Sequence, residues 1–140
     1  MSKLFHFTLS TPDAVLFDSE VEEVTFATPS GEITVMANHT PVVTLLTPGM
    51  MTIKTRGEEK ILAVGGGFVK IYENQAKAFT QTAEYAESID EQRAIEAKKQ
   101  AENLMREKVD EVTLADASSL LERNIARLKV VERKRHKKRY

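Results

Sequence analysis

Side chains that could do catalytic or metal chemistry are few and scattered in this sequence. The three histidines, His6, His39 and His136, lie far apart and share no spacing typical of metal ligands. Cysteine is absent, which excludes disulfides, thiolate zinc sites and a cysteine nucleophile. No serine, histidine and aspartate follow the pattern of a nucleophile elbow with its triad. We therefore expect no catalytic residue and no metal site, and we expect His6 to belong to a strand and His136 to a basic tail.

One glycine run, Gly65-Gly66-Gly67, follows an expected strand and invites comparison with a phosphate-binding loop. A complete P-loop needs a lysine and a serine or threonine after its last glycine, and Phe68-Val69 stand there instead. A dinucleotide-binding loop needs a following helix, whereas a second strand is expected here. The run is therefore predicted to form a turn or bulge between two strands.

The net charge of −1 hides an uneven distribution of charge along the chain. Residues 122–140 contain nine lysines and arginines against two glutamates, so the preceding part of the chain is acidic. A basic end on an acidic body predicts an acidic partner, which could be a protein, a lipid surface or a nucleic acid. The alternative is a solvated helix end, where cations interact favourably with the helix dipole.

Two further classes of function stay open on the residues alone. The basic tail at 133–139 could contact nucleic-acid phosphates, although no recognition motif accompanies it and Tyr140 is its only aromatic residue. A small-molecule enzyme is the other class, which is disfavoured because the chain offers no nucleophile, ligand set or base in a suitable arrangement.

Residues 1 to about 82 have the period of β-strands. In residues 5–9 the apolar side chains fall on alternate positions, as in a strand with one buried face. Turn residues interrupt the pattern at short intervals, and residues 55–59 are expected to turn a hairpin between strands at 51–55 and 60–64. Many short strands at even spacing predict an antiparallel β-sandwich or barrel.

The pattern changes to helical spacing near Glu84. The first helix has two candidate starts, a capping box of Ser88 with Glu91 or an N-cap at Asp90. The second helix is expected to begin at Thr113 after a short link at 110–112, so the two helices should fold back antiparallel. Their apolar seam is predicted from Ala94, Ala97, Ala101, Leu104 and Met105 on the first helix and Leu114, Ala117, Leu121, Ile125 and Leu128 on the second.

The chain is thus expected to divide into a β-sandwich domain over residues 1–86 and an α-helical hairpin with a basic tail over residues 87–140. The helical seam is thin, so the hairpin needs the sandwich or another protein for support. No apolar run approaches the roughly 18 residues of a membrane span, and the N-terminus lacks the apolar segment of a secretory signal. The composition, 41% hydrophobic and 29% charged, is typical of a globular protein, and we expect a soluble intracellular one.

Several short motifs, in order along nearly the whole chain, resemble those of the epsilon subunits of rotary F-type ATP synthases. They are Thr11-Pro12-Asp13, Phe17-Asp18-Ser19-Glu20-Val21-Glu22, Ser30-Gly31-Glu32-Ile33, Asn38-His39-Thr40-Pro41-Val42, Leu46-Thr47-Pro48-Gly49, Gly66-Gly67-Phe68-Val69, Ile89-Asp90-Glu91-Gln92-Arg93-Ala94 and Arg127-Leu128-Lys129-Val130. The chain differs at Asn38 and Thr40, where the family usually has glycine and alanine. Neither difference removes a chemical group on which the resemblance depends.

The resemblance implies a ten-stranded antiparallel sandwich followed by a two-helix hairpin. It implies a non-catalytic rotor subunit of the central stalk, whose sandwich grips the gamma subunit and rests on the c-ring. The ring-facing edge would include Glu32 and His39, although both also suit simple turn chemistry with Gly31 and Pro41. No nucleic acid is expected as a partner. The complex would place the chain at the cytoplasmic face of a bacterial plasma membrane, or alternatively at the stromal side of a thylakoid membrane.

The resemblance also implies that the second helix can leave the sandwich, extend along the stalk and block rotation in the direction of ATP hydrolysis. Cations of this helix would then meet acidic segments of the alpha and beta catalytic subunits. The candidate residues are Arg123, Arg127, Arg133, Lys134 and Arg135. Such charge complementarity would set register and rate more than affinity.

In members of the family that bind ATP, the nucleotide lies against the folded hairpin. The matching positions here are Glu84, Ile89, Asp90, Arg93, Ala94, Arg123 and Arg127. Arginine forks would hold phosphate oxygens, and carboxylates would accept from the adenine amino group. A further family arginine falls at Gln100, which weakens one phosphate contact. A regulatory ATP is thus the one ligand that the resemblance suggests, and no cofactor is expected.

Overall fold

The first strand shows how the β-domain is built from alternating side chains. Phe5, Phe7 and Leu9 are buried, whereas His6 and Thr8 between them are partly exposed on the other face. The computed structural model describes residues 3–107 and 111–138, without the side chains of 111–113 and 135–138. Its strands are β1 (Phe5–Ser10), β2 (Val15–Val21), β3 (Glu23–Thr28), β4 (Gly31–Met36), β5 (Val42–Leu46), β6 (Gly49–Thr55), β7 (Glu58–Val64), β8 (Gly67–Tyr72), β9 (Gln75–Thr80) and β10 (Ala83–Tyr85).

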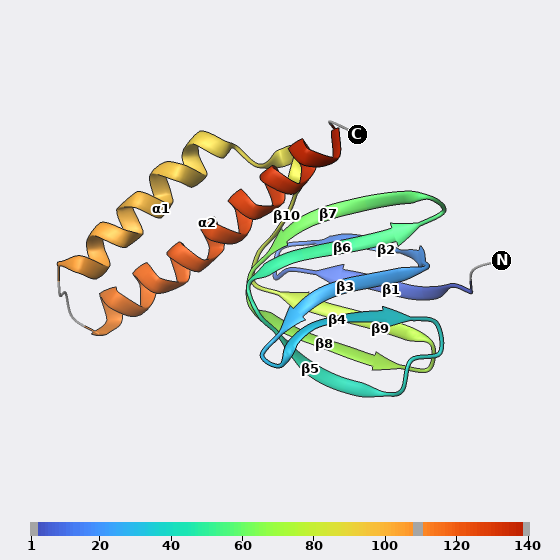
Figure 1. The fold of residues 1–140 in the computed structure, drawn as a ribbon. Helices are drawn as coiled ribbons and strands as arrows, with labels where there is room; N and C mark the ends of the chain where they lie inside the picture. The colour runs from blue at the N-terminus through green and yellow to red at the C-terminus, as the bar shows by residue number, and fades with distance from the viewer. Residues whose placement is uncertain (1–2, 108–110, 139–140) are drawn as a thin grey trace.

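The strands form two five-stranded sheets that face each other (Figure 1). The first sheet has the order β2-β1-β9-β8-β5 and the second the order β10-β7-β6-β3-β4. Every pairing between neighbours is antiparallel except that of β1 with β9, which is parallel. One apolar core lies between the sheets, and its largest fully buried side chains include Phe5, Phe7, Phe26, Met51 and Leu62. The predicted sandwich is confirmed.

Tight turns connect the strands where the sequence predicts them. The β6–β7 hairpin turns at Arg56 and Gly57, whose φ values of 49° and 79° are those of a two-residue hairpin turn. The glycine run predicted as a turn joins β7 of the second sheet to β8 of the first. A Cβ atom on Gly67 would lie 1.9 Å from the backbone oxygen of Phe79, so this glycine is required by the close approach of β9.

A short 3₁₀ turn, η1 (Ala86–Ser88), leads from β10 into the two helices, α1 (Glu91–Arg106) and α2 (Glu111–Lys138). Asp90 is the N-cap of α1, because its side chain accepts a hydrogen bond of 3.1 Å from the backbone N–H of Arg93. The start of α2 predicted at Thr113 is wrong, since the helix already begins at Glu111. A glutamate is a good helix former, and its charge is favoured in a first turn.

The second helix lies between the first helix and the sandwich (Figure 1). Its contact with the outer face of β6 and β7 buries Val130 against Ile61, Ala63 and Ala86. The predicted helical seam holds at Ala94, Ala101 and Ala117, which are all buried, but Met105, Leu114 and Ile125 are exposed. Asn124, Ala126 and Val130 are buried in their place. The prediction fails there because α2 packs on two neighbours, which moves its buried positions around the helix axis.

In the part of the chain that the structure describes, neither helix has a stretch long and apolar enough to cross a membrane.

Candidate functional site

A bidentate ion pair joins the sandwich to the helical hairpin. Arg127 of α2 donates from Nε to Glu84 Oε1 at 2.6 Å and from Nη2 to Glu84 Oε2 at 2.7 Å. Glu84 lies on β10, 43 residues before Arg127. The side chains are only 25% and 26% exposed, so solvent screens the pair less than a surface pair. We call it the Glu84–Arg127 latch.

A buried asparagine holds the arginine of the latch in place. Asn124 is fully buried on α2, and its amide donates to the backbone oxygen of Leu120 at 2.8 Å. The oxygen of the same side-chain amide, Oδ1, accepts a hydrogen bond from Arg127 Nη1 at 3.2 Å. The guanidinium group thus has partners at three of its donors, which leaves it little capacity for another anion while the hairpin is docked.

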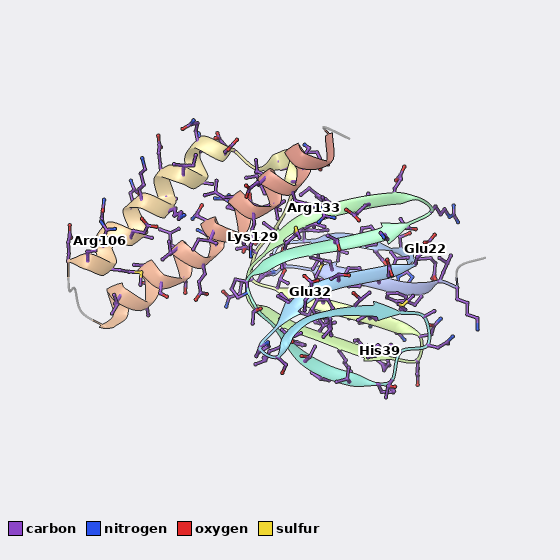
Figure 2. The ribbon with its side chains drawn as sticks, viewed as in Figure 1. Glu22, Glu32, His39, Arg106, Lys129 and Arg133 are labelled. Carbon is purple, nitrogen blue, oxygen red and sulfur yellow. The ribbon has the colours of Figure 1, made fainter. Side chains whose placement is uncertain are left out.

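A second, weaker ion pair lies further along α2. Arg133 Nη2 is 3.7 Å from Glu59 Oε1, and the arginine side chain is half exposed. Figure 2 shows Arg133 and Lys129 on α2 above the sheet, with Glu32 beyond them. A long, half-exposed pair of this kind contributes little to stability. Lys134 is half buried, and Arg135 lies outside the side chains that the structure describes.

Arg123 lies apart from the latch, in a cleft between α2 and two loops of the sandwich. The cleft has a volume of about 440 Å³, and its lining includes Gly65, Gly66 and Thr82 on the sandwich side. Arg123 Nε is buried there without a hydrogen-bond partner among the described residues. Asp116 and Glu122 line the same cleft, so its charge is not positive overall.

The residues predicted to bind a nucleotide therefore fall in three places. Glu84 and Arg127 form the latch, and Arg123 lines the separate cleft. Asp90 and Arg93 form a loose pair of 3.7 Å at the start of α1, where the Arg93 side chain is 85% exposed. Ala94 is buried, and Ile89 packs against the cluster around Val130.

The two residues predicted to face a membrane ring lie at opposite ends of one strand. Glu32 is exposed near the start of β4, and His39 follows the end of this strand. Figure 2 shows them separated along the sandwich. His39 Nδ1 donates to the backbone oxygen of Thr40 at 2.7 Å, a local hydrogen bond within the turn. Because β4 is an edge strand, a partner running along that edge would reach both residues.

An apolar row on the outer face of the first sheet was missed by the sequence analysis. The strand register places Leu45 of β5 beside Phe68 of β8, and Phe68 beside Phe79 of β9. The row continues from Phe79 to Ser10 of β1, which is polar, and ends at Val15 of β2, which pairs with Ser10. All four apolar side chains are at least 40% exposed, and the two phenylalanine rings stack with centroids 5.0 Å apart. The sequence feature that could have indicated this row is Phe68, an aromatic residue at an outward strand position next to Val69, which faces the core.

Among residues 3–107 and the described side chains of α2, no group of three or more histidines, aspartates and glutamates is placed to hold a metal ion.

Two family models match successive parts of the chain. Residues 4–86 match the beta-sandwich domain of the ATP synthase delta/epsilon chain, and residues 87–132 match its long alpha-helix domain. The chain is 34% identical to the ATP synthase epsilon chain of Bacillus velezensis over 128 residues, which cover 91% of this chain and 97% of the relative. It is 35% identical to that of Ruminiclostridium cellulolyticum over 131 residues, or 94% and 98% of the two chains.

Two solved assemblies contain chains of similar fold. A chain of the mitochondrial ATP synthase of Euglena gracilis aligns with a TM-score of 0.76 and 24% identity, over 85% of this chain and 76% of that one. A chain of the central stalk and c-ring of the Tetrahymena thermophila mitochondrial enzyme aligns with a TM-score of 0.60 and 15% identity, over 93% and 98%.

The latch predicts that Glu84→Gln loosens the docked hairpin. The change removes the negative charge facing Arg127 and should cost about 1–3 kcal/mol of docking free energy. Because the chain has no cysteine, Glu58→Cys and Arg106→Cys allow two dyes to report the distance between sandwich and hairpin by energy transfer. We expect a larger fraction of molecules with separated dyes. Glu87→Gln removes an exposed acid three residues away and serves as the control. Identical distributions for both variants would contradict the latch.

Proposed function

Because the chain belongs to the ATP synthase delta/epsilon family, as an epsilon chain and therefore a non-catalytic subunit, we propose that it is a rotor part of the central stalk whose hairpin restrains ATP hydrolysis. The observation that carries this proposal is the docking of the hairpin. Among the described residues it rests on one small apolar cluster, the half-buried ion pair of the latch and the weak Arg133–Glu59 pair. A helix held by so few contacts has a docked and a released state of similar free energy.

The apolar row is the surface by which the sandwich holds the gamma subunit. A row of exposed Leu45, Phe68 and Phe79 is unusual on a soluble surface and suits a partner with an apolar stripe. Lys70 and Lys77 follow in the next row of the same face and form a polar rim beside it. The outer face of the second sheet is partly covered by α2, so the first sheet offers the free face.

The edge strand β4 is the side that rests on the c-ring. Glu32 and His39 mark its two ends, so the footprint of the ring would extend along the whole strand. At the Glu32 end of β4 the edge shares a groove with Lys129 and Arg133 of α2, so the docked hairpin would border the ring contact there. His39 lies at the other end of the strand. We propose that the chain lies at the cytoplasmic face of a bacterial plasma membrane, where it is held only through the complex.

The cations of α2 restrain hydrolysis only after the hairpin leaves the sandwich. In the docked state Arg127 is held by Glu84, and Arg133 lies beside Glu59. The released helix would exchange these carboxylates for acidic segments of the alpha and beta subunits. Arg123, Lys134 and Arg135 belong to the same basic helix and would join this contact.

The proposed gamma surface predicts that Phe68→Ser weakens binding of the isolated gamma subunit at least about tenfold, because a central aromatic anchor is lost. Calorimetric titration of gamma with each variant measures the effect. Met36→Ser removes an exposed apolar side chain from β4 instead and should leave the affinity unchanged. The hairpin is not needed for this contact, so a chain ending at Ser88 should fold and bind gamma equally well. Unchanged binding by Phe68→Ser would overturn the assignment of this face.

The inhibitory role predicts that the triple change Arg133→Gln, Lys134→Gln and Arg135→Gln raises ATP hydrolysis by the assembled complex. Three charge contacts of about 0.2–1 kcal/mol each sum to about 0.6–3 kcal/mol, which corresponds to an increase between about threefold and about 150-fold. Arg127 is left intact, so the latch is not affected. ATP synthesis should change little.

The matched control neutralises three cations of α1, Lys98→Gln, Lys99→Gln and Arg106→Gln, which should leave hydrolysis unchanged. Equal hydrolysis by the α2 variant and the wild type would show that the basic end has another role.

We further propose that the docked hairpin binds ATP through the residues around the latch. Arg93 is exposed and only loosely paired with Asp90, so it can approach phosphate, whereas Arg127 is engaged by Glu84. A nucleotide must therefore compete with Glu84 for the Arg127 fork, and its affinity should be modest. The other candidate positions, Ile89, Asp90, Ala94 and Arg123, would surround the nucleotide only after some rearrangement.

Calorimetry of the full chain with MgATP tests this ligand. We expect saturable binding that Arg93→Ala and Arg127→Ala each weaken at least about tenfold, because each removes a fork-shaped phosphate contact. Arg106→Ala, at the far end of α1, should bind as the wild type does. The absence of heat at millimolar nucleotide would exclude the site.

A further inference from the structure

A histidine on the outer face of the first sheet lies between two carboxylates of the neighbouring strand. His6 of β1 has Nδ1 3.0 Å from Glu20 Oε1 and Nε2 in contact with Asp18 Oδ1. An ionised carboxylate can only accept a hydrogen bond. Both ring nitrogens must therefore donate at once, which only the protonated imidazolium can do.

The strand register explains why these three side chains meet. His6 pairs with Glu20, and Thr8 pairs with Asp18, so the two acids stand on one face of β2, two residues apart. Thr8 donates a long hydrogen bond of 3.5 Å to Asp18. On the other side of β1, the register places uncharged Gln75 beside His6 and Lys77 beside Thr8. The histidine is thus the cation closest to both acids.

The acids make His6 easier to protonate. The hydrogen bond to Asp18 and then that to Glu20 raise the pKa of His6 above its usual 6.5, and desolvation opposes this only in part. A group with a raised pKa stabilises the fold fully below the unfolded value of about 6.5. That contribution is lost as the pH rises through the folded pKa, which lies above 6.5. The cluster therefore changes charge at a pH above 6.5.

Strand β2 is the element that responds, because it is an edge strand of the first sheet and pairs only with β1. Two side-chain hydrogen bonds tie its backbone to the second sheet: Tyr85 Oη donates to Leu16 O at 2.8 Å, and Thr55 Oγ1 donates to Glu20 O at 3.2 Å. Its first residue, Val15, ends the apolar row. Loosening of β2 would therefore disturb one end of the free outer face.

We propose that His6, Asp18 and Glu20 form a proton-operated clamp, in which protonated His6 fastens the edge strand β2 and loss of the proton loosens it. Without the proton one ring nitrogen faces a carboxylate as an acceptor, so one hydrogen bond is lost and the two acids repel each other. The consequence for partner binding, a weaker hold on gamma at higher pH, rests on the proposed function.

Nuclear magnetic resonance of the full chain alone tests the clamp. The ring signals of His6 should titrate above pH 6.5, the usual value for histidine. Hydrogen exchange of the β2 amides, corrected for intrinsic base catalysis and compared with β8, should speed up at least about threefold between about pH 6 and 8.5. High salt should reduce this step, because the side chains are about half exposed.

Matched variants separate the clamp from a general effect of pH. His6→Gln should remove the step in β2 exchange, whereas His39→Gln, which has no carboxylate at its ring, should keep it. Asp18→Asn with Glu20→Gln should return the His6 titration to its ordinary range. This double variant changes two exposed side chains and does not depend on the folding of His6→Gln.

Titration of His6 at or below 6.5, or β2 exchange that does not follow the titration, would overturn the proposal. Gamma takes no part in these measurements, so failure of the proposed function would leave their outcome unchanged.

Discussion

The Glu84–Arg127 latch is the interaction on which the arrangement of the two domains depends. The helical seam is built on Ala94, Ala101 and Ala117, which bring the helices close but bury little apolar surface. Val130 adds one small cluster with the sandwich. An ion pair that is half buried and bidentate fixes orientation well, but its net contribution to stability is modest because both charges are desolvated. The hairpin is therefore held in a defined place without being held tightly.

Because of the latch, Arg127 can bind only one anionic partner at a time. Arg127 has its donors engaged by Glu84 and Asn124 in the docked state, so it cannot hold a phosphate or a partner carboxylate at the same time. Every other ligand of this arginine must compete with Glu84, an intramolecular acid that is always present at high effective concentration. The acidic sandwich thus supplies the intramolecular partner with which any other acid must compete for the basic helix.

Sequence patterns with a short range predicted most of the fold, and interactions of long range were missed. Alternation in residues 5–9, the turn at Arg56-Gly57 and the N-cap at Asp90 depend on neighbours within a few residues, and all three are observed. The resemblance singled out Glu84 and Arg127, yet no local pattern states that residues 43 positions apart satisfy each other. The exposed position of Ile125 and the apolar row depend on which elements meet in space. The spacing of apolar residues indicates that one face of a helix or strand is apolar, but it does not indicate which element packs against that face.

The two outer faces of the sandwich are used differently, and this separation decides how the domains can move. Helix α2 covers β6 and β7 of the second sheet, whereas Leu45, Phe68 and Phe79 stand on the outer face of the first. The apolar row is exposed while the hairpin is docked, and undocking would not change it, since the whole core lies between the two faces. The faces communicate at the edge, where Tyr85 of β10 donates to β2 next to the residue that carries the latch. Burial raises the pKa of the Tyr85 hydroxyl, so it keeps its proton and this hydrogen bond at neutral pH. Any coupling between the outer face of the first sheet and the docked hairpin on the second has its shortest route through β2 and β10, because the carboxylates that hold His6 lie on β2 and Glu84 of the latch lies on β10.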